Sequence, residues 1–272
     1  MLLSRKAGPV RFTLCSSRVI AFLVIVALAL GAPPAAAAST AALQSEQEGP
    51  SGYQQGVARL PDGWIFTGTT AMARTNEQLK VVKTNVQPIP LDWKRKGFNH
   101  VGDPDVAGKL LYAPLEQPLY ERGDQAMARY DTKSLKLVDI VPVTQHEASF
   151  VTVDPKTKIA YSMDRFGGDA LLRYDLRKNW APLPPLAMSR FVDKVQGADV
   201  ADGAVWLSTS DPGNGLYRVD LATGRVDDLG SAGHLGGEGE GIDATDMKSG
   251  RLHVLTVDPQ RNPIWFGHFS VA

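Results

Sequence analysis

Cysteine is almost absent from this chain, which holds one, Cys15, among 272 residues. It precedes an apolar run, Val19 to Gly31, which follows a basic leader and leads to the small residues Ala35 to Ala38. This order predicts a secretory signal peptide over residues 1–38 with a small-residue cleavage site. Cleavage would remove the cysteine, so the exported chain would have no disulfide, no thiol nucleophile and no lipid-anchoring cysteine.

Long apolar runs are otherwise missing. The run from Val19 to Gly31 is short for a bilayer span, which needs about 20 residues, and an uncleaved membrane anchor is the alternative. We therefore expect a secreted, extracytoplasmic protein with no membrane partner after cleavage.

The sequence also lacks an excess of basic charge. The leader contains four of the 29 basic residues and none of the 29 acidic ones, so the mature chain carries 25 basic against 29 acidic residues. This balance provides no basic surface for a nucleic-acid partner. The remaining length is sufficient for one domain held by its own core, and we expect a monomer.

Complete catalytic motifs are missing too. HEASF, from His146, lacks the second histidine of HExxH, and no GxSxG turn occurs. The run GGEGEG over 236–241 has neither the lysine nor the helix of a phosphate-binding loop and precedes a predicted strand. A Ser/His/Asp triad stays open, because the sequence does not select one pairing among many.

What the chain does contain is a fivefold repeat. Each copy has a small residue, a short strand, a polar turn and a second strand of large apolar residues. The small residues, 44 to 48 positions apart, are Gly56, Gly102, Ser149, Gly197 and Gly241. Four-stranded units at this period are typical of propeller blades. We predict an all-β fold, a five-bladed β-propeller of four-stranded antiparallel blades, as a single domain over residues 53–272.

Further features bear on this fold. Asp131, Asp175 and Asp220 recur in phase before hairpin turns, where an aspartate can bond nearby backbone amides. A β-sandwich is the alternative, but it does not explain repeats in phase. Residues 39–52 are polar and predict a flexible lead-in. However, the last unit shows three strands, so its fourth could come from around Gln44 to Gly52 and close the ring.

Propeller geometry predicts where polar residues converge. The leading loop, which enters the innermost strand of each blade, and the loop between the second and third strands open on one face around the central channel. The leading loops carry Gln54, Gln55, Asn99, His100, His146, Glu147, Gln196, Glu238 and Glu240. The other loops carry Glu116, Asp164, Asp211 and Asp258. This composition is typical of a metal or polar-ligand site.

Structural roles are the alternative for several of these residues. Regularly spaced acids after a second strand can simply end the strand and bond the next turn. His253 and His268 lie in predicted strands, where we expect packed or surface histidines. Recurring aromatic residues predict inter-blade core: Trp64, Tyr112, Tyr161 and Trp206.

Three segments carry a resemblance: QGADVADGAVWLSTSD from Gln196, LYRVDLATG from Leu216 and GEGID from Gly239. They resemble secreted propellers of the YVTN-repeat and gluconolactonase-like kind, and the first two are similar to the repeat of five-bladed glutaminyl cyclotransferases. That resemblance implies a polar site at the channel mouth, often with a divalent ion, that closes an N-terminal glutamine into pyroglutamate. Where the cyclotransferases have a glutamate in the strand after QG, this chain has Ser208. Glu240 best matches the metal-binding carboxylates of the gluconolactonase-like enzymes.

Three functions follow as predictions. The first is binding of a small polar molecule or peptide, or of Ca²⁺ or another divalent metal. Its metal ligands would be Glu240, Glu147 and His100, and its ligand-binding residues Gln55, Asp103, Gln196, Glu116, Asp164 and Asp211. The second is a hydrolase-like or cyclising enzyme in which Glu240 or Glu147 is the general acid/base, His100 the base or a ligand, and Gln55 and Gln196 hold the substrate. The third is a protein-interaction scaffold.

Overall fold

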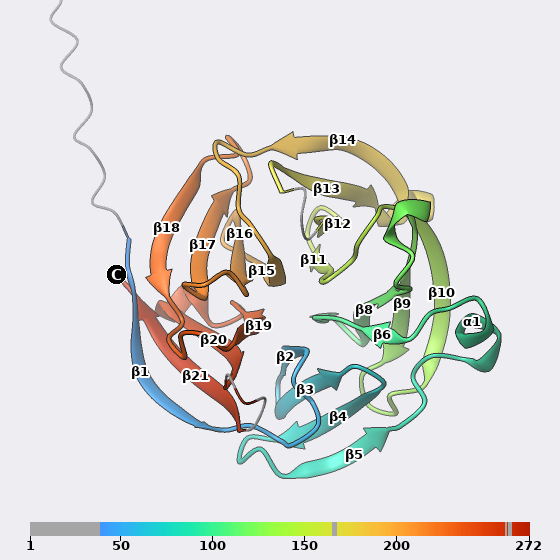
Figure 1. Cartoon of the computed structure of the whole chain (residues 1–272), viewed down its shortest axis with the longest axis horizontal. Coiled ribbons are helices and arrows are strands. Elements are labelled where there is room, and N and C mark those ends of the chain that lie inside the picture. The colour runs from blue at the N-terminus through green and yellow to red at the C-terminus, as the bar shows by residue number, and fades with distance from the viewer. Residues whose placement is uncertain (1–38, 165–167, 259, 261–262) are drawn as a thin grey trace, which may run out of the picture. The chain divides into compact units, whose positions relative to one another are not determined.

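The chain folds into a ring of five antiparallel sheets (Figure 1). The computed structural model describes residues 39–164, 168–258, 260 and 263–272, so the predicted signal peptide lies outside the described residues. The described residues lie in one compact unit. The five-bladed propeller is confirmed, and the alternative sandwich is wrong. Within the described residues no helix is long and apolar enough to cross a membrane.

Each blade places its strands in order from the channel outward. The first blade contains β2 (Gly56–Leu60), β3 (Gly63–Gly68), β4 (Ala71–Asn76) and β5 (Val81–Asn85). The second contains β6 (His100–Val101) and β7 (Asp105–Ala107), both paired with β8 (Leu110–Glu116), then β9 (Asp124–Asp131) and β10 (Leu137–Thr144). The third contains β11 (Thr152–Asp154), β12 (Ile159–Ser162), β13 (Ala170–Asp175) and β14 (Ala181–Ala187).

The fourth and fifth blades follow the same plan. The fourth contains β15 (Val195–Ala201), β16 (Ala204–Thr209), β17 (Gly215–Asp220) and β18 (Val226–Ser231). The fifth contains β19 (Glu238–Asp243), β20 (Arg251–Val257), β21 (Ile264–Val271) and β1 (Ala41–Glu48). Short helices lie in connections: α1 (Leu91–Arg95), η1 (Tyr120–Arg122), η2 (Leu176–Lys178) and η3 (Met247–Ser249).

Apolar second strands form much of the core. Every residue of β3 and of β16 is buried, because these strands lie between the sheets of neighbouring blades. The four aromatic residues assigned to the inter-blade core are all buried, which confirms that prediction: Trp64, Tyr112, Tyr161 and Trp206.

The repeated aspartates form turns as predicted. A side-chain oxygen of Asp131 accepts the backbone N–H of Ser134 at 2.7 Å, and one of Asp220 accepts that of Thr223 at 3.0 Å. These bonds stabilise the hairpin turn between the third and fourth strands, so the repeated aspartates have a structural role.

The ring is closed by its N-terminal strand. β1 pairs antiparallel with β21, from Ala41 opposite Val271 to Glu48 opposite Trp265, and the two strands run together in Figure 1. The fifth blade thus combines both ends of the described chain. The prediction of a closing N-terminal strand is confirmed, whereas the flexible lead-in is wrong for residues 41–48, because their backbone groups pair with the sheet edge.

Candidate functional site

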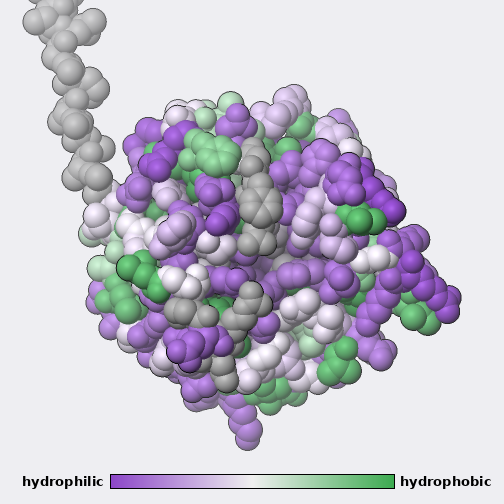
Figure 2. All heavy atoms as spheres, in the orientation of Figure 1, coloured by the Kyte–Doolittle hydropathy of each residue, from purple (hydrophilic) through white to green (hydrophobic). Residues whose placement is uncertain are grey.

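A polar cavity of about 350 Å³ opens at the mouth of the central channel. All five blades contribute to its lining. The lining residues are Gln54, Gln55, Thr69, His100, Gly102, Glu116, Tyr120, Ser149, Gln196, Glu238, Glu240 and Val257. Hydrophilic side chains also predominate around the centre of the face drawn in Figure 2.

The predicted residues that converge here come from both kinds of loop. His100 in β6 pairs with Glu116 in β8, so a leading loop and a second-strand end meet at one edge of the second blade. Glu116 also accepts the backbone N–H of Ala148, at 2.7 Å, through Oε1. This bond ties the second blade to the leading loop of the third. Seven predicted residues line the cavity: Gln54, Gln55, His100, Glu116, Gln196, Glu238 and Glu240.

Other predicted residues have roles in loops instead. Asp164 Oδ1 accepts the backbone N–H groups of His146 and Glu147, each at 3.0 Å. Asp211 Oδ1 accepts the backbone N–H of Gly213 at 2.8 Å. None of these side chains is among the described residues that line the cavity, and for Asp164 and Asp211 the bonds match the structural alternative. Glu147 is 3% exposed and is not among the residues that line the cavity.

Glu240 is the most enclosed acid of the cavity. Its residue is 2% exposed, and it lies where the pairing of β19 with β20 shifts, between Gly239 and Ile242. Such a bulge redirects a side chain out of the regular alternation of a strand. The hydroxyl of Ser208 donates to the Glu240 carbonyl. Ser208, which stands where the cyclotransferases have a glutamate, therefore supports the backbone of Glu240.

Asp103 lies on the channel axis rather than in the cavity lining, which corrects its predicted role as a ligand-binding residue. Its residue is fully buried. Its carboxylate accepts backbone N–H groups from three other blades, at 2.9 Å from Val57, 3.0 Å from Ala198 and 3.5 Å from Ile242. Its own N–H donates to Ser149 of the remaining blade at 2.7 Å. Burial raises the pKa of Asp103 well above its usual value, and the three N–H donors act in the opposite direction.

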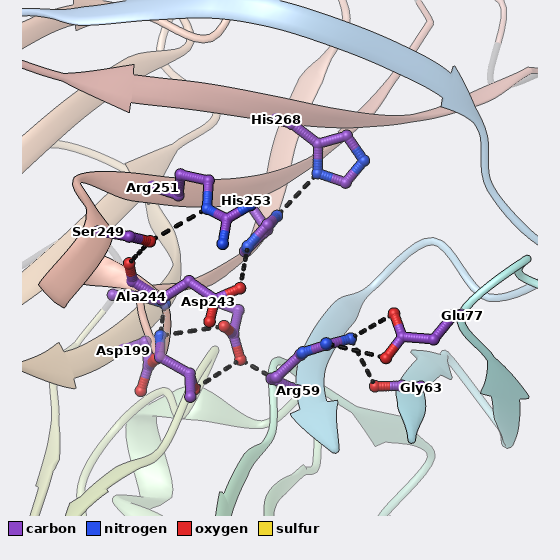
Figure 3. Close-up of polar contacts among 12 residues, drawn as sticks. Arg59, Gly63, Glu77, Asp199, Asp243, Ala244, Ser249, Arg251, His253 and His268 are labelled. Atoms are coloured by element: carbon purple, nitrogen blue, oxygen red, sulfur yellow. Dashed lines mark hydrogen bonds and ion pairs between the residues drawn. The ribbon is translucent and has the colours of Figure 1, made fainter. Parts of the chain in front are cut away.

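A second set of buried side chains, the axial ring, lies further along the inner strands. Each member accepts a backbone N–H from the next blade. The bonds run to Asp105 from Val153 (2.6 Å), to Thr152 from Val200 (2.8 Å), to Asp199 from Ala244 (2.6 Å) and to Asp243 from Arg59 (2.7 Å). Figure 3 shows the last two contacts. Sequence reasoning missed this ring, although its members recur at intervals of 47, 47 and 44 residues.

Burial controls the ionisation of the axial ring. It raises the pKa of Asp105 to about 6 and that of Asp243 to about 7. It also raises the pKa of Asp199 well above its usual value, and the neighbouring carboxylates of Asp105 and Asp243 add to this effect. These hydrogen bonds join neighbouring blades. Because the carboxyl groups in them have raised pKa values, the stability of the fold should depend on pH.

Metal binding depends on how the possible donor side chains are grouped. Among the residues that the structure describes, no three His, Cys, Asp or Glu side chains are grouped so that they could hold a metal ion. Ca²⁺ or another divalent metal on Glu240, Glu147 and His100 stays a prediction, and no step below depends on a metal.

Comparison with known proteins places the fold. No family model matches the chain, and no curated protein matches it. The chain is similar to the glutaminyl cyclase of Myxococcus xanthus, with a TM-score of 0.63 and 14% identity over 86% of this chain and 98% of that one. It is also similar to a luciferin-regenerating enzyme, with a TM-score of 0.53 and 10% identity over 79% of this chain and 76% of that one.

The protein is a five-bladed β-propeller with a polar cavity at its channel mouth. The glutaminyl cyclase shares that fold, so the resemblance noted for the repeats around Gln196 and Leu216 holds at the level of architecture. At 14% identity the likeness shows the fold alone.

Proposed function

We propose that the channel-mouth cavity binds a small polar ligand, such as a polar metabolite or the N-terminal residue of a peptide. Its volume of about 350 Å³ suits a small molecule. Carboxylates and amides supply hydrogen-bond acceptors and donors on several sides, and His100 supplies an imidazole. Because every blade contributes, the ligand would contact residues far apart in sequence but rigidly placed by the ring.

The burial of Glu240 within the cavity lining is the observation that supports this proposal most directly. Glu240 combines a nearly complete burial of 2% exposure with a place in the cavity lining. Its backbone is fixed by Ser208 and by the bulge in β19. A residue held in this way is suited to recognising a ligand with little loss of side-chain entropy.

An acid/base enzyme on the same face is the second candidate. It is favoured by the fold likeness, which extends over 98% of the glutaminyl cyclase chain. In such a cyclisation the α-amino nitrogen of an N-terminal glutamine bonds to the side-chain amide carbon, and ammonia leaves. The neutral α-amine would attack, and Glu240 would accept the one proton that the attacking nitrogen loses and donate it to the departing nitrogen. Gln55 and Gln196 would hold the substrate amide.

A ligand panel tests both candidates. Thermal unfolding would be followed with N-terminal glutamine peptides, amino acids, lactones and Ca²⁺, each added separately. A ligand at one hundred times its Kd stabilises the folded state by about 2.7 kcal/mol. We expect at least one organic class to raise the Tm of the wild type and of the exposed control Glu48→Gln, but not of Glu240→Gln. If no organic class raises the Tm, the binding proposal is wrong.

Mass spectrometry of the peptide reactions separates catalysis from binding. Cyclisation would appear as loss of ammonia from the peptide, and we expect Glu240→Gln to lower its rate at least 100-fold, the usual range for loss of a general acid/base. Cyclisation by the variant at the wild-type rate would remove the catalytic role of Glu240 and leave ligand binding to be judged by the panel.

Export is part of the proposal as well. The order of basic, apolar and small residues before Ala38 supports it. N-terminal sequencing of protein recovered from outside the cytoplasm should begin near Ser39, and a retained leader would contradict cleavage.

A further inference from the structure

A second cavity, the groove, lies between the closing strand β1 and strands of the first and fifth blades. It has a volume of about 480 Å³. It shares no lining residue with the channel-mouth cavity. The side chains that matter here are Gln47, Arg59, Asp246, Arg251, His253 and His268.

Hydrogen bonds link four of these side chains in a row. Asp246 Oδ2 lies 3.1 Å from His253 Nε2, and His253 Nδ1 lies 2.7 Å from His268 Nδ1. Gln47 Nε2 lies 3.5 Å from His268 Nε2. His253 and His268 are cross-strand partners in β20 and β21, which explains why two rings 15 residues apart meet. Figure 3 shows the contact between the two rings, with Arg251 beside them.

This row fixes the tautomers of both neutral imidazoles. An ionised Asp246 can only accept, so His253 carries its proton on Nε2 and accepts through Nδ1. His268 must then donate from Nδ1, which leaves its Nε2 without a proton. That nitrogen faces Gln47, whose amide can donate to it.

The surroundings favour the neutral form of both rings. His253 is 5% exposed, and its ring packs against that of Trp64 with centroids 4.8 Å apart. Burial lowers the pKa of His253 to about 4. Burial also lowers the pKa of His268, and the positive charges of Arg251 and Arg59 lower it further. The electrostatic potential at the half-buried His268 ring is therefore positive.

The charged groups around the His268 ring differ in how many of their hydrogen-bonding atoms already have partners. Arg59 is paired with Glu77 at 2.9 Å, and Asp246 is bonded to His253. Among the described residues, the hydrogen bond of Arg251 runs from Nε to Ser249 Oγ at 3.1 Å. The terminal amino groups of Arg251 remain able to donate to a ligand in the groove.

We propose that the groove is a second ligand site, for a small oxyanion or carboxylate held by the Arg251 guanidinium and by His268 in its protonated form. Neutral His268 offers only an acceptor at Nε2, so it must take up a proton before it can donate to an anion. A bound anion offsets the charges of Arg251 and Arg59 that oppose this proton. Binding of the anion and uptake of a proton are thus coupled, and each favours the other.

Calorimetric titration with sulfate tests the proposal. Sulfate stays doubly charged from pH 6 to pH 8, so its own ionisation does not contribute, and chloride keeps the ionic strength constant. Titrations in two buffers of different ionisation enthalpy report the protons taken up. We expect saturable binding with proton uptake, and an affinity that falls by up to about tenfold per pH unit as the pH rises.

Variants assign the two donors. Arg251→Gln should weaken binding at least tenfold, and His268→Gln should abolish proton uptake. Arg225→Gln, an exposed change in the fourth blade, should alter neither. Absence of saturable binding, unchanged affinity in Arg251→Gln, or binding without proton uptake would overturn the proposal.

A measurement on the unaltered chain covers the case in which His268→Gln does not fold. In the NMR spectrum of the wild-type imidazoles, sulfate should raise the pH at which the His268 ring titrates. An unchanged titration would overturn the proposal. The two sites are distinguished by their variants, because Glu240 lines only the channel-mouth cavity and Arg251 lines only the groove.

Discussion

Asp103 of the second blade accepts the backbone N–H of Ala198 in the fourth at 3.0 Å, although 95 residues separate them. With its bonds to the other three blades, this one residue joins the whole ring at its axis. Ala198 and Ile242 lie two residues after Gln196 and Glu240 in strands β15 and β19. The same bonds that stabilise the ring therefore also position the cavity.

Removing the Asp103 carboxylate should destabilise the fold strongly. Asp103→Ala leaves three buried N–H groups without their acceptor, and each such group costs about 1–3 kcal/mol. We expect the free energy of unfolding in urea to fall by about 3 kcal/mol or more. Asp92→Ala, an exposed change in α1, is the control. An unchanged urea midpoint for Asp103→Ala would show that the axial bonds do not carry stability.

Asp243 should make stability depend on pH. Its pKa is raised by burial to about 7 in the folded state, against an ordinary value of 3.8. Between these values the folded chain binds more protons than the unfolded chain, so this stabilisation is complete below about pH 4 and is lost as the pH rises to about 7. Asp243→Asn removes the titration.

Urea unfolding at pH 5 and pH 8 measures this effect. The stability of the wild type relative to Asp243→Asn should decrease from pH 5 to pH 8, by an amount on the order of a few kcal/mol. An equal difference at both pH values would mean that the Asp243 carboxyl titrates normally in the folded chain.

Gly241 should tolerate no side chain. A Cβ there would lie 2.5 Å from Asp103 Oδ1 and 2.6 Å from the Gly56 Cα. Gly241→Ala would push the fifth blade away from the axis, and we expect a loss of about 1–3 kcal/mol together with weaker ligand binding next to Glu240. Gly213→Ala is a suitable control, because its nearest atom would be Asp211 Oδ1 at 3.3 Å. Equal urea midpoints for the two variants would contradict the close approach.

The closing strand should be required for a stable monomer. A chain that begins at Gly49 lacks β1 and exposes the edge of β21, whereas a chain that begins at Ser39 retains it. An open strand edge promotes association with other chains. We expect the shorter chain to unfold at lower temperature and to associate in sedimentation experiments. Identical behaviour of the two chains would show that the ring does not depend on β1.

The repeats made the fold predictable from the sequence. The site residues were harder to predict, because the sequence does not show in which direction a side chain points. The period of about 46 residues located all five blades, and phase alone placed His100, Gln196 and Glu240 at one mouth. The sequence predicts Asp103 as a ligand-binding residue together with His100. In the structure Asp103 lies between β6 and β7, and its carboxylate accepts the backbone N–H of Ala198 on the channel axis. No sequence pattern predicted that these two strands are separate.

The contact between His253 and His268 could not be predicted from the sequence either. His253 and His268 meet because β20 and β21 pair in one register, in which the two residues are directly opposite. A shift of one residue would have placed the rings on opposite faces of the sheet. The axial ring, by contrast, could have been found, since Asp199 and Asp243 recur at the blade period.

Equilibrium titration of the strongest ligand from the panel into wild type, Glu240→Gln and Glu48→Gln tests the role of the channel mouth most directly. The enclosed position of Glu240 predicts binding that is at least tenfold weaker in Glu240→Gln, a difference of about 1.4 kcal/mol, and unchanged binding in Glu48→Gln. Equal affinity of the wild type and Glu240→Gln would contradict the assignment of this cavity as the ligand site.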